Sequence, residues 1–320
     1  MAGQLPAPRR LSSPGPASLL GGWLAWPDAR VAELVDAAGL NPAAPQGAYR
    51  FNSCPGHRRW IGCHPCGEDG RMVDPEHSYE HPYPAADLAT RYPFVPLETR
   101  RLPDDEMLDR ARAFHEAMGA RRSVRMFSSR PVPGELIEQA VLAASTAPSG
   151  AHKQPWTFVA VQDPELKSCI RQEAEAEERS NYLENRMNDE WLEALAPLGT
   201  DHHKEFLEVA PWIVVLFEQR YELRPDGSRR KNYYVKESVG IAAGLFIAAI
   251  HDMGLATLTH TPSPMAFLRR LLGRPENERP FVMFPIGHPF PGLQVPDLRR
   301  KSLSEVFVEV DRRGDGSTVR

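Results

Sequence analysis

Regular hydrophobic spacing begins near residue 104 and predicts two consecutive helices. The first covers residues 106–120, and its apolar stripe consists of Met107, Leu108, Ala111, Phe114 and Met118. The second follows Pro133 and ends before Pro148, with a stripe of Leu136, Ile137, Ala140, Val141 and Ala144. Both stripes have the i, i+3, i+4 spacing of an amphipathic helix. Gly119 is a C-terminal stop signal for the first of them.

Short apolar runs predict strands between further helices. Residues 156–161 (WTFVAV) and 212–217 (WIVVLF) are apolar or β-branched, and shorter strands are expected at 256–259 and 279–287. Further helices are expected from Pro164, at 238–253 and at 265–272. The helix at 238–253 is apolar on all sides, which predicts a central position or a subunit interface. This order of helices and strands indicates an α+β single domain.

The helix that begins at Pro164 changes character along its length. Leu166, Cys169 and Ile170 lie on one apolar face, which predicts that Cys169 is a core residue. From Arg171 to Trp191 the segment keeps helix-forming residues but has little apolar stripe. Such a segment is either a solvated helix or a lid over a site, and the sequence alone favours the solvated helix.

The composition is that of an ordinary globular protein, with 320 residues, 42% hydrophobic and 25% charged. The formal net charge of −4 gives no excess of positive charge for a phosphate backbone, so nucleic acid is not expected as a partner. No run of about 18 apolar residues lacks a charge, so no membrane span is expected. The N-terminus has no uninterrupted apolar segment typical of a signal peptide, and we expect a cytoplasmic protein.

The first 71 residues differ from the rest, because they are rich in Pro, Gly, Ala and Arg and contain no Lys. Two interpretations stay open: a disordered N-terminal extension, or a mis-annotated start with Met72 as the true first residue. Residues 72–104 are expected to form an extended arm, 105–310 the main domain and 311–320 a frayed tail. A CxxC pair with neighbouring residues suggests a zinc site, but its spacing is too close for a normal finger, so no metal is expected. The candidate ligands are Cys54, His57, Cys63, His64 and Cys66.

Two short segments carry the strongest candidate chemistry. Residues 121–125 (RRSVR) place three guanidinium groups and a hydroxyl together, which suits a phosphate group, although a solvated charged loop has the same composition. Residues 147–152 (APSGAH) are small enough for a flat ligand to approach the backbone, although a plain turn uses the same residues. The motifs GxGxxG, GxxxxGK[ST], GxSxG and HExxH are absent from the sequence.

A series of short motifs occurs in a fixed order between about residues 95 and 310. They are RRSVR at 121–125, APSGAH at 147–152 with PWTF at 155–158, NY at 181–182, KEFLEVAP at 204–211, Tyr233-Tyr234 with Glu237-Ser238, LLGRP at 271–275 and VPDLRRKSL at 295–303. Together they resemble the nitroreductase superfamily of flavin mononucleotide (FMN) enzymes and, within it, the iodotyrosine deiodinases. The resemblance implies an α+β nitroreductase-like fold with a central mixed sheet flanked by helices. It also implies a domain-swapped homodimer with one FMN per subunit.

The resemblance further implies which residues bind the cofactor. The phosphate and ribityl contacts would come from Arg121, Arg122, Ser123, Val124, Arg125 and Arg300. Pro148 and Ser149 would lie under the isoalloxazine ring. Thr259, His260 and Thr261 would approach its N5 edge, with Thr261 as the catalytic residue. The family commonly has Thr where this sequence has His260, but the contact there is largely through the backbone, so FMN binding is expected to persist.

The residues that the resemblance implies for substrate binding suit an amino-acid zwitterion. Glu178 and Tyr182 are four residues apart on the polar helix, so they lie on one face. Glu178 would bind the α-ammonium, Lys204 and Tyr182 the α-carboxylate, and the Ala151 backbone N–H the phenolate of a halotyrosine. The implied reaction is reductive dehalogenation, with electrons from NAD(P)H or a separate reductase.

Two alternatives stay open. The first is a general FMN nitroreductase or quinone reductase that uses NAD(P)H. The second is a zinc-dependent interaction module at residues 54–66 joined to an inactive flavin scaffold.

Overall fold

The computed structural model describes residues 86–184 and 186–310. The chain divides into two units after Leu97. The described part of the first unit contains the helix α2 (Ala86–Arg91), and all other described elements belong to the second unit. The interpretations of residues 1–71, the zinc candidates at 54–66 and the expected tail at 311–320 lie outside the described residues. The arm expected at 72–104 is described only from residue 86.

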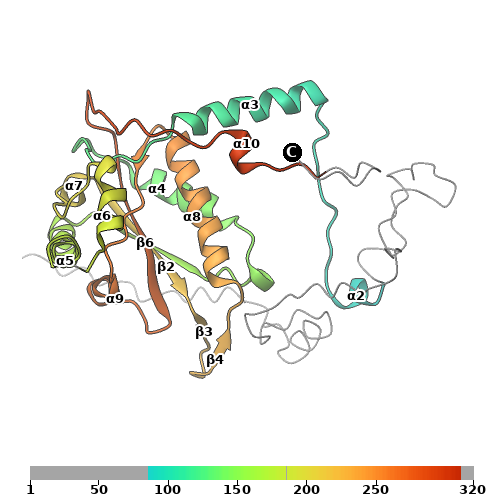
Figure 1. Cartoon of the computed structure of the whole chain (residues 1–320). Helices are drawn as coiled ribbons and strands as arrows, with labels where there is room; N and C mark the ends of the chain where they lie inside the picture. The colour runs from blue at the N-terminus through green and yellow to red at the C-terminus, as the bar shows by residue number, and fades with distance from the viewer. Residues whose placement is uncertain (1–85, 185, 311–320) are drawn as a thin grey trace, which may run out of the picture. The chain divides into compact units, whose positions relative to one another are not determined.

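A four-stranded sheet forms the centre of the second unit (Figure 1). Its strands are β1 (Trp156–Val161), β2 (Trp212–Gln219), β6 (Glu278–Gly287) and β5 (Ala256–Thr257), in that spatial order. The three ladders between them are antiparallel, and a parallel bridge joins Ser123 to Thr257 beside β5. The parallel bridge gives the sheet its mixed character and brings the arginine-rich segment to its edge.

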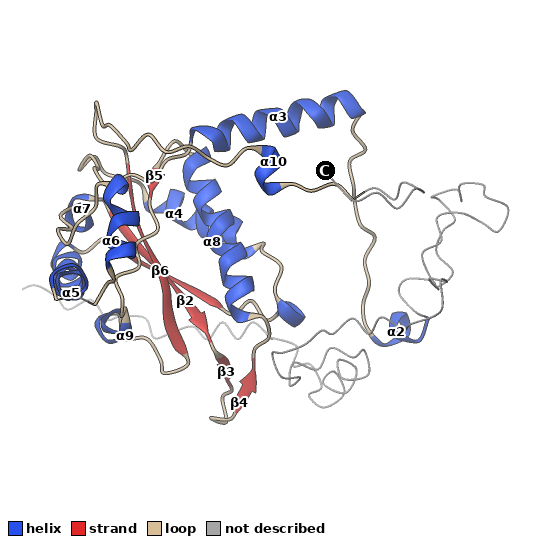
Figure 2. Ribbon diagram, in the orientation of Figure 1, coloured by secondary structure: helices blue, strands red, loops and turns tan. Residues whose placement is uncertain are grey.

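Helices cover both faces of this sheet (Figure 2). Val214 and Leu216 of β2 pack with α4 (Gly134–Ser145) and α8 (Val235–Asp252). The intervening residues of β2 pack on the opposite side with α5 (Pro164–Leu183), α7 (Phe206–Val209) and α9 (Ala266–Leu271). Successive side chains of a strand point to opposite faces, so a strand covered on both sides is apolar throughout. This is the reason for the run WIVVLF, and the predicted α+β architecture is confirmed.

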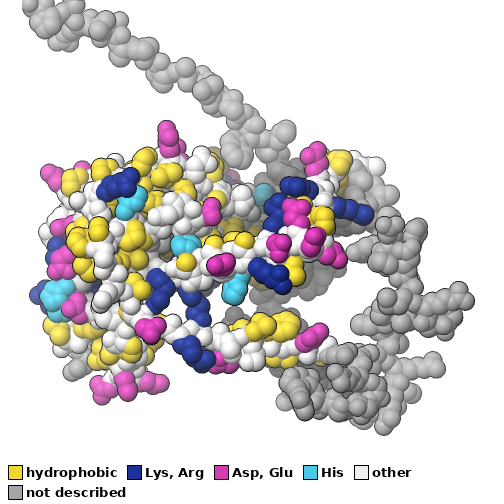
Figure 3. All heavy atoms as spheres, turned by 90° about the horizontal axis from the view of Figure 1, so that it is seen from above, with side chains coloured by type: hydrophobic (Ala, Val, Ile, Leu, Met, Phe, Trp, Pro, Cys, Tyr) yellow, Lys and Arg dark blue, Asp and Glu magenta, His cyan; other side chains and the backbone are white. Residues whose placement is uncertain are grey.

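The apolar helix α8 has one buried and one exposed side. Val239, Ala242, Phe246 and Ile250 are completely buried in the core, whereas the opposite side exposes a stripe of Gly240, Ile241, Gly244 and Leu245. Helix α3 (Asp104–Ala120) contains no buried residue, although it carries the predicted apolar stripe. Figure 3 shows hydrophobic side chains at the surface of the face seen from above. Apolar faces left open in this way need another surface to cover them.

Several short elements of the fold are not marked by the hydrophobic pattern. They are α6 (Asp189–Leu195), the 3₁₀ turns Gly150–His152 and Ala196–Leu198, α7, the hairpin of β3 (Tyr221–Leu223) with β4 (Arg229–Lys231), and α10 (Leu303–Val306). The hairpin strands have three residues each, mostly with polar side chains and none of them buried, so hydrophobic periodicity does not mark them. The turn between them contains Asp226 and Gly227, and Gly227 has a φ of +79°.

The expected burial of Cys169 is wrong. Cys169 is exposed, and the buried residues of α5 are Lys167, Ile170, Ala174, Glu178 and Asn181. These five positions follow the i, i+3, i+4 series that defines one helical face, and Cys169 is not in that series. The buried face of α5 contains more polar residues than apolar ones.

Candidate active site

Three side chains implied for substrate binding lie together in the structure. Glu178 and Tyr182 come from the C-terminal half of α5, and Lys204 comes from the segment before α7. The Lys204 Nζ atom lies 3.8 Å from Glu178 Oε2 and 5.6 Å from the centroid of the Tyr182 ring. The side chains of Lys204 and Glu178 are only 2% and 9% exposed. The site therefore contains a nearly dry pair of opposite charges.

Burial changes the protonation equilibria of this pair. Burial raises the pKa of Glu178, and the charge of Lys204 opposes the rise. Burial likewise lowers the pKa of Lys204, and the charge of Glu178 opposes the fall. Each charge is costly to bury and is only partly compensated by the other. A ligand with one ammonium and one carboxylate would supply an additional partner to each of them.

A tight turn holds Lys204 in this position. Gly199 has a left-handed conformation with a φ of +59°, and Asp201 accepts a hydrogen bond of 2.9 Å from the His203 backbone N–H. The Lys204 ammonium donates to the Thr200 hydroxyl at 3.3 Å and to the Asp201 carbonyl oxygen. Gly at position 199 suits this turn, because residues with a side chain rarely adopt positive φ.

The arginine-rich segment lies beside the loop that follows β5. The Val124 backbone N–H donates to the Thr257 carbonyl at 3.3 Å, next to the Ser123–Thr257 bridge. As a result Arg121, Ser123 and Thr259 line one cavity of about 330 Å³, with residues 244–248 of α8 along its side. The Val124 side chain is buried in the core, so only its backbone faces this region.

The C-terminal segment is attached to the same place. Arg300 donates to the carbonyl oxygens of Gly119, at 2.8 Å, and Arg121, at 2.7 Å. Arg122 donates to the Pro296 carbonyl oxygen. These contacts join segments that are about 175 residues apart in sequence. Arg121, Arg122 and Arg300 are therefore brought together at the end of α3, and guanidinium groups suit a phosphate monoester.

Arg125 lies apart from the other arginines. It lines a second cavity, of about 440 Å³, together with Thr200, Asp201 and Phe206. Burial lowers the pKa of Arg125, and the neighbouring Tyr182 phenol opposes the fall. The Arg125 charge in turn contributes to the lowered pKa of Lys204. Arg125 thus connects the arginine-rich segment with Tyr182 and Lys204.

His260 is buried next to these cations. Its ring packs edge-on against Phe206, with 5.6 Å between the ring centroids. Among the described residues, the His260 Nε2 atom has no hydrogen-bond partner. Burial, and to a smaller extent the charges of Lys204 and Arg125, lower the pKa of His260 to about 3. A buried nitrogen without a partner is a reason to expect a polar ligand in the site.

The flanking threonines are exposed on the other side of the same segment. Thr259 lines the cavity of Arg121 and Ser123, whereas Thr261 lines a separate cavity of about 680 Å³ with Arg269 and Arg279. Side chains alternate along an extended segment, which explains why His260 is buried between two exposed threonines.

The segment 148–151 lies at the other end of α8. The Gly150 N–H donates to the Ser238 hydroxyl at 3.3 Å, and a Cβ atom on Gly150 would lie 2.6 Å from the Tyr233 carbonyl oxygen. Pro148 and Ala151 are exposed, and Ser149 Oγ accepts from the Gln154 N–H at 2.9 Å. The Arg121 cavity reaches α8 at residues 244–248. At 1.5 Å per helical residue the two places are roughly 12 Å apart along α8.

The residues present fit FMN. The arginine cluster suits its terminal phosphate, and the unpaired His260 nitrogen and the threonine hydroxyls supply polar partners for its other groups. Within the described ranges, no group of three His, Cys, Asp or Glu residues is arranged to hold a metal.

Comparison with known proteins identifies the family of this chain. The nitroreductase family model matches residues 118–288. An iodotyrosine deiodinase of Haliscomenobacter hydrossis is 56% identical over 215 residues, which are 67% of this chain and 96% of that protein. This chain belongs to the nitroreductase family. Iodotyrosine deiodinase 1 of Rattus norvegicus is 44% identical over 211 residues, which are 66% of this chain and 74% of that protein.

A solved structure supports the same relationship within the nitroreductase family. It is oxidised iodotyrosine deiodinase bound to FMN and 3-iodo-L-tyrosine. It matches with a TM-score of 0.53 and 28% identity, and the match covers 62% of this chain and all of that one.

The sequence analysis missed three polar residues that hold this nitroreductase-family site together. Arg171 contacts Glu208 and Glu175 contacts the Lys204 N–H, both in the segment 204–210. Asn181 donates to the Ser263 carbonyl at 3.0 Å, which ties α5 to the loop after Thr261. The available signal for Arg171 and Glu175 was their spacing, because Lys167, Arg171, Glu175, Glu178 and Tyr182 recur every three or four residues. A polar stripe with that spacing indicates a helix face that contacts another polar segment.

His260 makes a testable contribution to acid sensitivity. Its pKa of about 3 in the folded protein lies below the ordinary value of 6.5, so below pH 6.5 the unfolded chain binds a proton that the folded chain does not. The stability from this group is present above pH 6.5 and is lost as pH falls toward 3, by about 1.4 kcal/mol per pH unit. Between pH 7 and pH 5, the free energy of unfolding of His260→Thr should fall by about 2 kcal/mol less than that of wild type, as measured by urea denaturation. Equal losses in both proteins would contradict this assignment.

Proposed function

We propose that this protein is an FMN-dependent oxidoreductase that removes halogen from halotyrosines and releases tyrosine and halide. The observation that carries the proposal is the buried pair of Glu178 and Lys204 with the half-buried Tyr182 ring beside it. The charges of Arg125 and Lys204 act on the neighbouring His260. The similarity to iodotyrosine deiodinases, at 40–56% identity over two thirds of the chain or more, supports it.

The chemistry of the cluster suits the amino-acid part of the substrate. Glu178 would accept hydrogen bonds from the α-ammonium, and Lys204 and Tyr182 would donate to the α-carboxylate. The Ala151 backbone N–H would donate to the phenolate oxygen. Because the pair is nearly dry, hydrogen bonds between charged groups there would be strong.

The cofactor residues are assigned by their positions. Arg121, Arg122, Ser123 and Arg300 would hold the phosphate, with the backbone of Val124 beside them, and Arg125 would approach the flavin from the substrate side. Pro148 and Ser149 would lie under the ring. Thr259 and His260 would contact the flavin near N5, and the Thr261 hydroxyl would donate to N5 itself. Bound FMN supplies the two electrons that, with one proton, replace the carbon–halogen bond by a carbon–hydrogen bond and release halide.

A homodimer would complete this site. The exposed apolar stripe of α8 and the uncovered helix α3 are surfaces that a second copy can bury. Within one chain, the Pro148–Ala151 segment and the Arg121 cavity lie at different ends of α8. A partner that supplies its own 148–151 segment would bring both halves to one flavin, which is the domain-swapped arrangement expected from the sequence.

The source of electrons and the location in the cell stay predictions. NAD(P)H, directly or through a reductase, is the expected donor, and the cytoplasm is the expected compartment. Among residues 86–184 and 186–310, no helix combines the length and the apolar character needed to span a bilayer.

The test is an anaerobic titration of the dithionite-reduced, FMN-loaded protein with 3-iodotyrosine. We expect each equivalent of substrate to reoxidise one flavin and to yield one tyrosine, followed by absorbance and chromatography. If the reduced flavin is reoxidised by a nitroarene or quinone but not by iodotyrosine, the general reductase becomes the better function. Metal analysis of the same preparation tests the zinc module at residues 54–66.

A further inference from the structure

One face of α5 is polar from end to end. Lys167, Arg171, Glu175, Glu178 and Tyr182 follow each other at spacings of four, four, three and four residues, so their side chains lie on the same side of the helix. The C-terminal half of this stripe belongs to the proposed substrate site. The N-terminal half contacts the segment 204–210, which contains Lys204.

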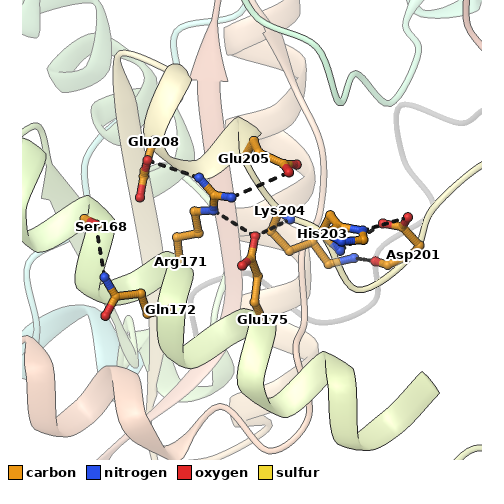
Figure 4. A network of polar contacts seen from close by, with 9 residues as sticks. All are labelled: Ser168, Arg171, Gln172, Glu175, Asp201, His203, Lys204, Glu205 and Glu208. Carbon is orange, nitrogen blue, oxygen red and sulfur yellow. Dashed lines mark hydrogen bonds and ion pairs between the residues drawn. The ribbon is translucent and has the colours of Figure 1, made fainter. Parts of the chain in front are cut away.

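The N-terminal half of the stripe holds that segment through direct contacts. Lys167 is buried, and its Nζ atom donates to the carbonyl oxygens of Glu208 and Ala210 at 2.9 Å each. Arg171 donates to Glu175 Oε1 at 2.8 Å and to Glu208 Oε2 at 3.2 Å, and it lies 3.5 Å from Glu205 Oε1. Figure 4 shows the Arg171 guanidinium between these carboxylates.

The same carboxylate that Arg171 binds also holds Lys204. Glu175 Oε1 accepts a hydrogen bond of 2.7 Å from the Lys204 backbone N–H (Figure 4). Burial acts to raise the pKa of Glu175, but the hydrogen bonds from Arg171 and the Lys204 N–H outweigh it and keep that pKa below its ordinary value. Glu175 is therefore a charged acceptor shared between a guanidinium and the main chain of the substrate-binding lysine.

A lysine side chain has four rotatable bonds and considerable rotamer entropy. When a ligand binds, the lysine ammonium loses little conformational entropy only if the lysine backbone is already fixed. In this structure the fixing contact comes from Glu175, one turn before Glu178 on the same helix face. The arrangement aligns the backbone of Lys204 with the carboxylate that its side chain faces.

We propose that Arg171 and Glu175 form a positioning pair that sets Lys204 opposite Glu178 and thereby determines affinity for the amino-acid zwitterion. This inference rests on the proposed function, because it assigns Lys204 to the substrate. The pair touches neither substrate nor cofactor. Its contribution is to prepare the binding geometry before the ligand arrives.

The test compares Arg171→Ala and Glu175→Ala with two reference variants. In Glu175→Gln the amide oxygen can still accept the Lys204 N–H, so it serves as the conservative rescue. Glu177→Ala removes a carboxylate of α5 that pairs with Arg186, at 3.1 Å, away from Lys204, so it is the matched control. Each FMN-loaded protein is titrated with 3-iodotyrosine in the oxidised state, followed by flavin fluorescence.

We expect the two alanine variants to bind iodotyrosine roughly tenfold more weakly than wild type, with KM raised and kcat within about twofold. Glu175→Gln should recover most of that affinity, and Glu177→Ala should match wild type. FMN content and quinone reduction should stay unchanged in all four. Unchanged iodotyrosine affinity in the alanine variants, or equal losses of FMN, quinone reduction and iodotyrosine binding, would overturn the proposal.

A second readout separates this inference from the proposed function. The Lys204 N–H donates its hydrogen bond to Glu175, so its amide hydrogen exchange should become faster in Glu175→Ala whatever the substrate is. If wild type does not bind iodotyrosine but exchange at Lys204 becomes faster in the variant, the proposed substrate fails and the positioning contact stands. Unchanged exchange at Lys204 overturns the positioning pair itself.

Discussion

Replacing Lys204 by Gln is expected to weaken halotyrosine binding about 10- to 150-fold. The Lys204 ammonium is nearly completely buried and lies 3.8 Å from Glu178, so its hydrogen bond to a bound α-carboxylate would be desolvated. Such charge-assisted hydrogen bonds contribute about 1.5–3 kcal/mol, and about 1.4 kcal/mol corresponds to a tenfold change in affinity. Titration of the oxidised, FMN-loaded variant with 3-iodotyrosine measures the loss.

Glu178→Gln should produce a loss of similar size, because it removes the negative charge that would pair with the α-ammonium and leaves the Lys204 charge without its partner. The control ligand is 2-iodophenol, which has the halogenated ring but no amino-acid group. Both variants should bind it as wild type does, and quinone reduction should fall less than about twofold. Equal losses with both ligands would indicate a folding defect, and no loss with either would favour the general reductase.

Arg125→Ala is expected to lower FMN affinity about 10- to 150-fold. Arg125 is the arginine of the 121–125 segment that faces the substrate cluster, where partial burial lowers its pKa. Loss of a charge-assisted contact to the flavin in such a place would cost about 1.5–3 kcal/mol. Recovery of free-flavin fluorescence on dilution of the yellow protein measures the dissociation constant.

Arg130→Ala is the matched control for this prediction. Arg130 is five residues further along the same segment and is exposed to solvent. Its removal should leave FMN affinity within about twofold of wild type. An Arg125→Ala protein that retains FMN as firmly as the Arg130 control would exclude Arg125 from the flavin site.

The elements with strong hydrophobic patterns were predictable from local sequence. The strand β1 occupies the predicted residues 156–161, and the predicted positions of α4, α8 and β6 differ from the observed ones by a few residues. These elements bury residues at a regular period, and that period is written in the sequence. The family resemblance likewise rested on local motifs, and the chain does belong to the nitroreductase family.

The polar half of α5 shows where local pattern is insufficient. Its composition favoured a solvated helix, but Glu178 and Asn181 are buried, as is Lys167 in the preceding part of α5. Polar groups can be buried only where partners compensate the loss of water, and here the partners are carbonyl oxygens and charged groups of residues 204–263. They lie 26 to 82 residues away in sequence, so no local pattern reveals them.

The sequence by itself determined the longer helices and strands of the core, because the spacing of apolar residues decides which face is buried. It also determined the residue types of the site, with three arginines in one segment and a carboxylate and a phenol one helical turn apart. Only the tertiary structure decided that Arg125, and not Arg121, is the arginine near Lys204. It also decided that Glu175 holds the backbone of Lys204. Those outcomes depend on how distant segments pack on the sheet, and packing satisfies buried polar groups across the chain rather than along it.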